Sequence, residues 1–340
     1  MRKLLNTLYI TEEDIYLTLD GENVVCRRDG EVKLRLPLVN IEEIICFSYL
    51  GCSPALMGKC VRNGISISFL SPYGNFEARV QGRARGNILL RQKQFSLFEN
   101  PPVLLRQNTV ATKLANTASV VRRTVKDHPE VNDDGSLSHC IELLTEYAKS
   151  VYEEDDVQKI LGIEGKGSAA YFDIFDKLIL QQKDDFDFCT RTKRPPLDRV
   201  NALLSFIYTI FTCDYAAALE SVGLDSYMGY YHAMRPGRTS LASDLIEEAR
   251  CIAERFVLTM INLKIVRASD FDVQVTGAVL LNKDGKRKVL EKWQEKKRTD
   301  IIHPYLKQKI KLGLLPFVQS MLLAKYIRGE IEEYPCYIIK

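Results

Sequence analysis

The chain has 340 residues, enough for two domains of ordinary size, and its 46% hydrophobic and 27% charged residues are typical of a soluble globular protein. The longest unbroken apolar run, Tyr215 to Leu219, is too short to cross a membrane, and the chain opens without a signal-peptide core. We therefore expect a cytoplasmic protein with no membrane partner. The net charge of +3 gives no indication of a nucleic-acid partner, and nine cysteines without a C-x-x-C pair favour reduced, buried thiols.

Residues 1–83 predict a β-rich domain. Short segments there alternate apolar and polar residues with a period of two, which is typical of half-buried strands. Turn signals such as Asp20-Gly21 separate the segments, and one short helix is expected at residues 54–62. The clearest predicted strands lie at residues 15–19, 32–36 and 65–69.

The hydrophobic period changes after this domain. Residues 84–93 form a basic segment that begins the first helix, and residues 94–340 predict a helical domain in which apolar residues recur at three-to-four spacing. Helices are predicted at residues 103–125, 138–161, 171–182, 199–221, 241–266 and 305–326. The predicted fold class is therefore α+β, with a β-rich N-terminal domain followed by a larger all-α domain.

Three basic islands stand out on this nearly neutral chain. Gln81 to Lys93 contains no acidic residue, a second island spans residues 191–199, and residues 283–298 hold eight basic and three acidic side chains. Such islands suit a phosphate backbone, although solvated helix faces would explain each of them taken alone.

His232 lies in a loop that contains glycines and a proline, which favour one defined shape. Thr239 or Ser240 can cap the helix predicted to follow. On that helix Asp244 and Glu247 are three residues apart, so both carboxylates share one face. A histidine followed by two carboxylates is compatible with half of a metal site, but the carboxylates would also favour a helix N-terminus without a metal.

Glu164 is a second candidate metal ligand. It lies between Gly162 and Gly165, which predict a turn with close backbone approach beside an apolar, small-residue helix. A surface turn with an incidental glutamate is the competing interpretation.

Three stretches of the helical domain carry motifs in a fixed order. They are G-I-E-G at 162–165 followed by A-A-Y-F at 169–172, then D-R-V-N-A-L-L-S-F at 198–206, and finally His232 with P-G-R-T-S-L-A-S-D-L-I-E at 236–247. In these motifs the chain resembles the CRISPR-associated adaptation integrase family ("Cas one"). The resemblance extends over nearly the whole chain and is greatest to the subtype I-C branch.

The resemblance implies a β-sandwich-like N-terminal domain that mediates homodimerisation, and a helical catalytic domain. It also implies that Glu164, His232 and Glu247 are catalytic and hold a divalent metal ion. Asp244 and Asn201 match further positions of the family and are expected to support the site.

One departure from the family pattern concerns the acidic helix. Many members continue it with phenylalanine, arginine and proline, whereas this chain has Ala249-Arg250-Cys251. Because the proline is missing, we expect the helix to run on straighter.

The implied reaction is a transesterification in which the 3′-hydroxyl of a pre-spacer attacks a phosphodiester of the CRISPR repeat. An imidazole among oxygen ligands favours manganese, with magnesium as a working substitute. The implied partners are double-stranded DNA (pre-spacer and repeat with its leader), a small ferredoxin-like adaptation protein ("Cas two") and an end-trimming nuclease, in a prokaryotic cytoplasm. The expected DNA contacts are Arg83, Arg85, Arg235, Arg238, Arg250, Lys286 and Arg287.

Two other functions remain open on the residues alone. A general metal-dependent DNA-repair nuclease would use the same residues with water as the nucleophile. A non-catalytic architectural DNA-binding protein would use the carboxylates only as helix caps, and would tolerate alanine at all three positions.

Overall fold

The computed structural model describes residues 6–72, 74–80 and 88–339. Its N-terminal part consists of two sheets with helix α1 (Pro54–Asn63) packed against both. The three-stranded sheet is antiparallel in the order β2-β3-β4, and the four-stranded sheet has the order β1-β5-β6-β7, in which only the last pair is antiparallel. The strands are β1 (Thr7–Ile10), β2 (Tyr16–Asp20), β3 (Asn23–Arg28), β4 (Glu31–Pro37), β5 (Glu43–Cys46), β6 (Ser66–Leu70) and β7 (Phe76–Val80).

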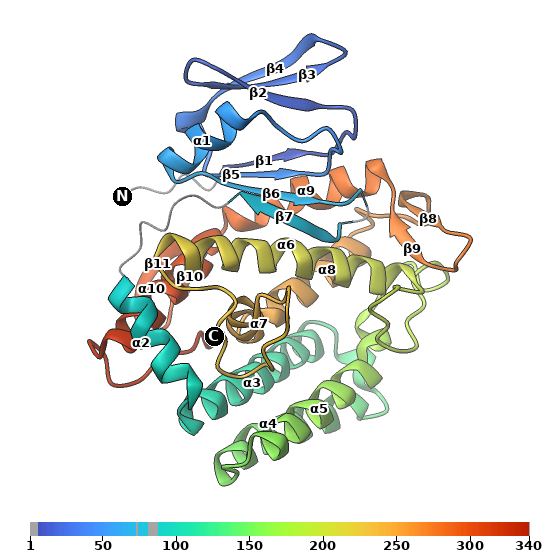
Figure 1. Ribbon diagram of the computed structural model, residues 1–340. Helices are drawn as coiled ribbons and strands as arrows, with labels where there is room; N and C mark the ends of the chain where they lie inside the picture. The colour runs from blue at the N-terminus through green and yellow to red at the C-terminus, as the bar shows by residue number, and fades with distance from the viewer. Residues whose placement is uncertain (1–5, 73, 81–87, 340) are drawn as a thin grey trace.

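Apolar side chains from both sheets form one N-terminal core. Leu17, Val24 and Ile44 are fully buried in it, because alternate residues of each strand face the opposite sheet. Figure 1 shows the four-stranded sheet lying between the three-stranded sheet and the long helix α6 (Arg199–Ser221). Phe47, just after β5, stacks on Phe206 of α6 with ring centroids 5.9 Å apart, so the sheet is packed directly on the helical part.

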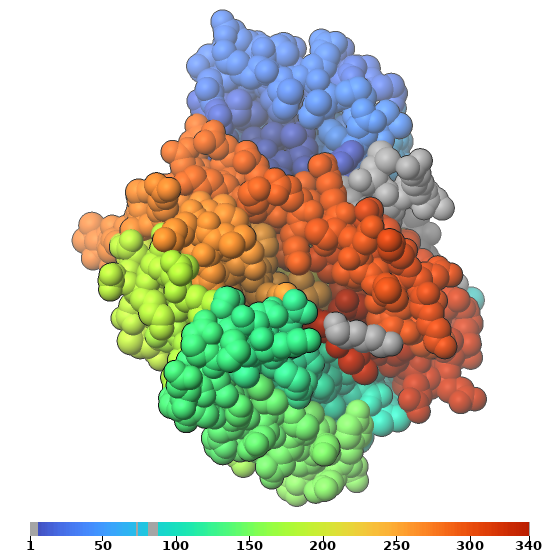
Figure 2. Space-filling model, turned by 180° about the vertical axis from the view of Figure 1, so that it is seen from behind, coloured from blue at the N-terminus to red at the C-terminus, as the bar shows by residue number. Residues whose placement is uncertain are grey.

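The C-terminal part is mainly helical. Its other helices are α2 (Ile88–Glu99), α3 (Val103–Asp127), α4 (Ser136–Ser150), α5 (Val157–Asp173), α7 (Ser240–Glu247), α8 (Arg250–Asn262), α9 (Lys283–Lys297) and α10 (Leu315–Arg328). Two short hairpins join them, β8 (Phe271–Val273) with β9 (Val279–Leu281), and β10 (Asp300–His303) with β11 (Gln308–Lys311). Figure 2 shows the segment from α8 to β11, coloured orange to red, between the N-terminal strands and the green helices α3 and α4.

Helix α6 is the central element of the helical part. By length and composition it would be apolar enough to cross a membrane, but 72% of its apolar window is buried inside the protein. It contacts α7, α8, α10 and β9. Its apolar character is therefore that of a core helix in a soluble protein.

The predicted fold class is confirmed: strand sheets precede a helical part. The helical part differs from the all-α prediction in its two hairpins, and the second of them, β10–β11, occupies part of the first half of the helix predicted at residues 305–326. The basic segment at residues 283–298, by contrast, forms helix α9.

The helix predicted at residues 241–266 is two helices, so the expectation of a straighter helix was wrong. The break lies at Ala249, whose φ of −116° and ψ of 0° leave the helical region. The neighbouring side chains of Glu247 and Glu248 are both buried. Glu248 accepts hydrogen bonds from Tyr334 Oη and the backbone N–H of Tyr337, so the break directs it to the C-terminal segment.

Candidate metal centre

The buried carboxylate of Asp244 shapes the loop that carries His232. Asp244 is 0% exposed and accepts the backbone N–H groups of Tyr230 (2.7 Å), Tyr231 (3.0 Å) and His232 (2.9 Å). Gly229 is required for this arrangement, because a Cβ there would lie 2.6 Å from Asp244 Oδ2. A single side chain of α7 thus fixes the backbone of three consecutive loop residues.

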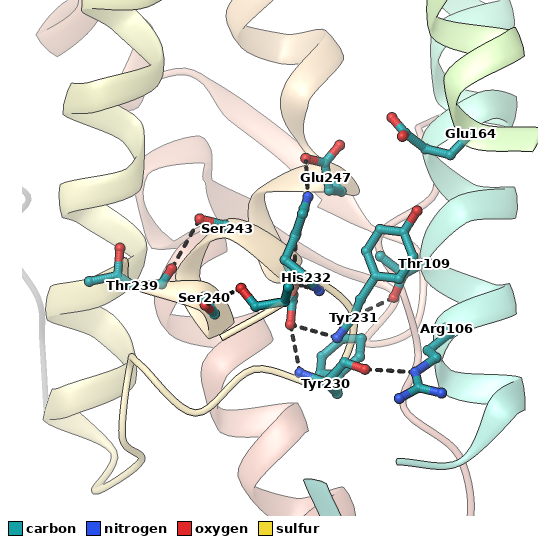
Figure 3. Close-up of polar contacts among 12 residues, drawn as sticks. Arg106, Thr109, Glu164, Tyr230, Tyr231, His232, Thr239, Ser240, Ser243 and Glu247 are labelled. Carbon is teal, nitrogen blue, oxygen red and sulfur yellow. Dashed lines mark hydrogen bonds and ion pairs between the residues drawn. The ribbon is translucent and has the colours of Figure 1, made fainter. Parts of the chain in front are cut away.

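The same carboxylate orients the imidazole ring. His232 Nδ1 lies 2.8 Å from Asp244 Oδ1, and because a carboxylate can only accept, Nδ1 carries the proton. The other ring nitrogen, Nε2, lies 3.9 Å from Glu247 Oε1. Figure 3 shows His232 and Glu247 facing one another, with Glu164 approaching from another helix. An imidazole that donates through one nitrogen to a buried carboxylate is the usual arrangement of a metal-ligating histidine.

Glu247 ends helix α7 and is 3% exposed. Its Oε1 lies 2.8 Å from Arg250 Nη2, and its Oε2 lies 2.8 Å from Lys113 Nζ. Burial alone would raise the pKa of this carboxyl, but Arg250, Lys113 and His232 outweigh burial and lower the pKa of Glu247 to about 2. Glu247 is therefore ionised at neutral pH, as a metal ligand must be.

Glu164 lies within helix α5, not in the turn that its flanking glycines predicted. Its Oε1 accepts a hydrogen bond from Ser168 Oγ (2.9 Å), one turn further along, and pairs with Lys113. Gly167 allows α5 to approach α3 closely, because a Cβ there would lie 2.3 Å from Leu114 Cδ2. Gly167 therefore serves helix packing, and this packing places Glu164 next to α3.

Lys113 of α3 connects the two glutamates. Its side chain is 9% exposed and forms ion pairs with both Glu164 and Glu247. Among the residues that the structure describes, no group of three or more histidine, cysteine, aspartate or glutamate side chains is close enough to hold a metal ion directly. Glu164, His232 and Glu247 thus face one region, but an ammonium group lies between the two carboxylates.

The donor set nevertheless fits a divalent cation. His232 Nε2 lies 3.9 Å from Glu247 Oε1, so an imidazole nitrogen and a carboxylate oxygen face one another. Glu164 and Glu247 already hold one cation, the ammonium of Lys113, between them. Two carboxylates and one imidazole match the ligands that manganese accepts.

Comparison with known proteins identifies the family. The profile of the family described as CRISPR associated protein Cas1 matches residues 8–295. The chain belongs to the Cas1 family. It is 41% identical over 99% of its length to CRISPR-associated endonuclease Cas1 1 of Chlorobaculum tepidum, 99% of which is covered. It is 40% identical over its full length to CRISPR-associated endonuclease Cas1 2 of Rhodospirillum rubrum, all of which is covered. The predicted enzyme class, a CRISPR-associated endonuclease, is thereby confirmed.

A more distant relative is also similar in sequence, and two solved structures share the fold. The chain is 29% identical, over 98% of its length and 60% of the relative, to a CRISPR-associated exonuclease Cas4/endonuclease Cas1 fusion of Geobacter sulfurreducens. Its fold matches a casposase bound to integration product with a TM-score of 0.85 at 20% identity, covering 98% of this chain and 94% of the other. It matches a chain of a Cas6-RT-Cas1–Cas2 complex with a TM-score of 0.82 at 20% identity, covering 98% and 36%.

Asn201, which was expected to support the site, lies at the start of α6. Asn201 Oδ1 accepts hydrogen bonds from Arg191 Nη1 (2.6 Å) and the backbone N–H of Thr192 (3.1 Å). The guanidinium groups of Arg191 and Arg250 both lie over the ring of Tyr208, at 5.6 and 4.8 Å from its centroid. Asn201 is therefore linked to Glu247 through Arg191, Tyr208 and Arg250, and does not face the metal region itself.

The predicted DNA contacts differ in their surroundings. Arg235 and Arg287 are exposed, and Arg238 is half-buried. Lys286 is unsuited to hold a phosphate, because it is buried and its ammonium donates to the backbone carbonyl of Pro72. The prediction of a DNA contact at Lys286 is therefore wrong for this structure. Arg83 and Arg85 lie outside the described residues.

Two residues of the centre escaped the sequence prediction. Lys113 and Ser168 bind Glu164, and neither belongs to the motifs that carry the family resemblance. The sequence does contain an indication for Lys113. This lysine lies one residue before Leu114 and three after Val110, on the apolar face of a predicted helix. A lysine at such a position needs a buried acidic partner.

Proposed function

We propose that this Cas1 family member integrates new DNA segments into a CRISPR repeat array. The attacking group is the 3′-hydroxyl of a pre-spacer, and the bond attacked is a phosphodiester of the repeat. Family membership supports the reaction class. The observation that carries the residue assignment is the convergence of Glu164, His232 and Glu247, from three different elements, on one buried region beside Lys113.

Glu164, His232 and Glu247 would hold a divalent ion, manganese by first preference and magnesium as a substitute. When bound, such an ion polarises the phosphoryl group and stabilises the charge that develops on its oxygens. Asp244 keeps His232 in the tautomer with a free Nε2. Arg250, which is bound to Glu247, is placed to hold a phosphate next to the ion.

We further propose how the protein meets its DNA. The exposed Arg235 and the half-buried Arg238, in the loop after His232, would hold phosphates close to the centre, and Arg287 on α9 would do so farther out. Such contacts carry no base specificity, which suits the capture of DNA of any sequence. Arg83 and Arg85 in the basic segment are proposed to extend this surface.

The remaining partners are proposed on the evidence of relatives. A small ferredoxin-like partner is supported by the fold match to a chain of a Cas1–Cas2 complex, and an end-trimming nuclease by the relative fused to an exonuclease. We also propose a homodimer formed through residues 1–83, a catalytic part from residue 94 onward, assignment to the subtype I-C branch, and a location in the prokaryotic cytoplasm.

Strand joining tests this proposal. Glu164→Ala, His232→Ala and Glu247→Ala should each lower the joining of a pre-spacer into a repeat plasmid by at least about hundredfold, because each removes a metal ligand. The matched controls Glu146→Ala and His128→Ala change exposed side chains and should join normally. Unchanged joining by the three variants would contradict the assignment. Cleavage of branched DNA without joined product would favour the repair nuclease instead.

A further inference from the structure

Lys113 supplies a cation at the point where the proposed metal site needs one. Its ammonium lies 2.8 Å from Glu247 Oε2 and also pairs with Glu164 Oε1. Burial alone would lower the pKa of Lys113, but Glu247 and Glu164 outweigh burial and raise it. The group is therefore charged at neutral pH, and in the absence of another cation it holds together two carboxylates that would otherwise repel each other.

A small cavity lies next to Lys113. Its volume is about 20 Å³, and its lining includes Lys113, Gly167, Tyr171, Arg250 and Glu254. A space of this size accommodates one water-sized group, and a lysine ammonium has about that size. Lys113 itself lines the cavity, and its side chain is a flexible four-carbon stem that ends in the ammonium.

The cavity also offers a partner for an ammonium. Glu254 is 3% exposed, and its Oε1 accepts a hydrogen bond from Tyr208 Oη at 2.6 Å. The hydroxyl of Tyr171, another residue that lines the cavity, also interacts with Glu254. Among the described residues Glu254 forms no ion pair, so a cation placed beside this buried carboxylate would be stabilised.

We propose that Lys113 is a built-in counter-cation with two positions. In the metal-free protein its ammonium bridges Glu164 and Glu247, and when a divalent ion occupies the site the ammonium withdraws into the cavity and pairs with Glu254. The two cations cannot share the same carboxylate oxygens, because like charges a few ångström apart repel strongly. The inference rests on the proposed function, since it concerns the regulation of the same site, and it makes Lys113 a determinant of metal affinity.

Titration of the full-length protein with Mn²⁺, without DNA, tests the inference. Free Mn²⁺ is followed by electron paramagnetic resonance, and thermal melts of the metal-free proteins check folding. Lys113→Met removes the competing charge and should bind Mn²⁺ at least about tenfold more tightly than the wild type. Lys126→Met changes an exposed lysine of the same helix and should bind like the wild type.

The Glu254→Gln variant tests the second position of the ammonium. Glutamine keeps an acceptor for the Tyr208 hydroxyl but removes the negative charge that would pair with the ammonium. The substitution should weaken Mn²⁺ binding several-fold in the wild type and have no effect in the Lys113→Met background. If Lys113→Met does not fold, Lys113→Gln replaces it. Equal or weaker binding by the Lys113 variant overturns the inference, as does a Glu254→Gln effect that persists in the double variant. His232→Ala should abolish Mn²⁺ binding. If the wild type binds no Mn²⁺, or binds it equally well after His232→Ala, the proposed metal site itself is refuted.

Discussion

Asp244 is the carboxylate that shapes the loop of His232. One buried carboxylate accepts the backbone N–H groups of Tyr230, Tyr231 and His232, together with His232 Nδ1. Hydrogen bonds to an ionised acceptor are about twice as strong as neutral ones, so the loop geometry depends on this charge. The residue that organises a site can thus be distinct from the residues that bind the ligand.

Asp244→Asn tests this role. The amide directs two N–H groups at donors that need an acceptor, so we expect the free energy of unfolding to fall by about 2–3 kcal/mol. Mn²⁺ affinity should also fall by about 10- to 100-fold, because the tautomer of His232 is no longer fixed. Urea denaturation and Mn²⁺ titration measure the two effects. Asp133→Asn changes an exposed aspartate and serves as the control, and identical behaviour of the two variants would contradict the role.

At the scale of elements, the packing of α5 on α3 determines where Glu164 lies. Gly162 and Gly167 are both in α5, but a Cβ at Gly162 would meet nothing within 4 Å, whereas a Cβ at Gly167 would lie 2.3 Å from Leu114 Cδ2. Two glycines of the same helix therefore have different roles. One only weakens the helix, and the other permits the close approach that brings Glu164 to Lys113.

The two glycines give opposite expectations for alanine. Gly162→Ala should raise the free energy of unfolding by about 0.5–1 kcal/mol, because alanine favours the helix and meets no neighbour. Gly167→Ala should lower it by about 1–3 kcal/mol, because α5 must move away from α3, and strand joining should fall with it. Urea denaturation of both variants is the measurement. A stabilising Gly167→Ala would show that the close contact does not constrain the position of α5.

For the molecule as a whole, the fold class, the helix at Arg199–Ser221 and the three strands β2, β4 and β6 follow from hydrophobic periodicity. The break at Ala249 could not be predicted, because it depends on Glu248 binding Tyr334 and Tyr337, nearly ninety residues later. The helical state of Glu164 was missed for a related reason. Glycine has a low helix propensity, so the sequence does not predict a helix here. Only the close contact of α5 with α3 explains why a glycine stands at position 167 of the helix.

The role of the candidate centre as a metal site stays a prediction, but the positions of its residues can be compared with the sequence analysis. The resemblance named Glu164, His232 and Glu247, which the structure brings to one region, and Asp244, which holds His232. Lys113 was missed because its partners lie 51 and 134 residues away along the chain, and no local pattern links them. Contacts of such long range depend on the packing of α3, α5 and α7, which sequence periodicity does not specify.

The convergence of three ligands on one cation is tested most directly by crystals of the full-length protein soaked in Mn²⁺. Anomalous scattering locates manganese independently of the protein atoms. We expect one peak within about 2.5 Å of a Glu164 oxygen, His232 Nε2 and a Glu247 oxygen, with the Lys113 ammonium moved away from both carboxylates. A folded protein whose manganese binds elsewhere, or that binds none while these side chains remain as described, would contradict the account.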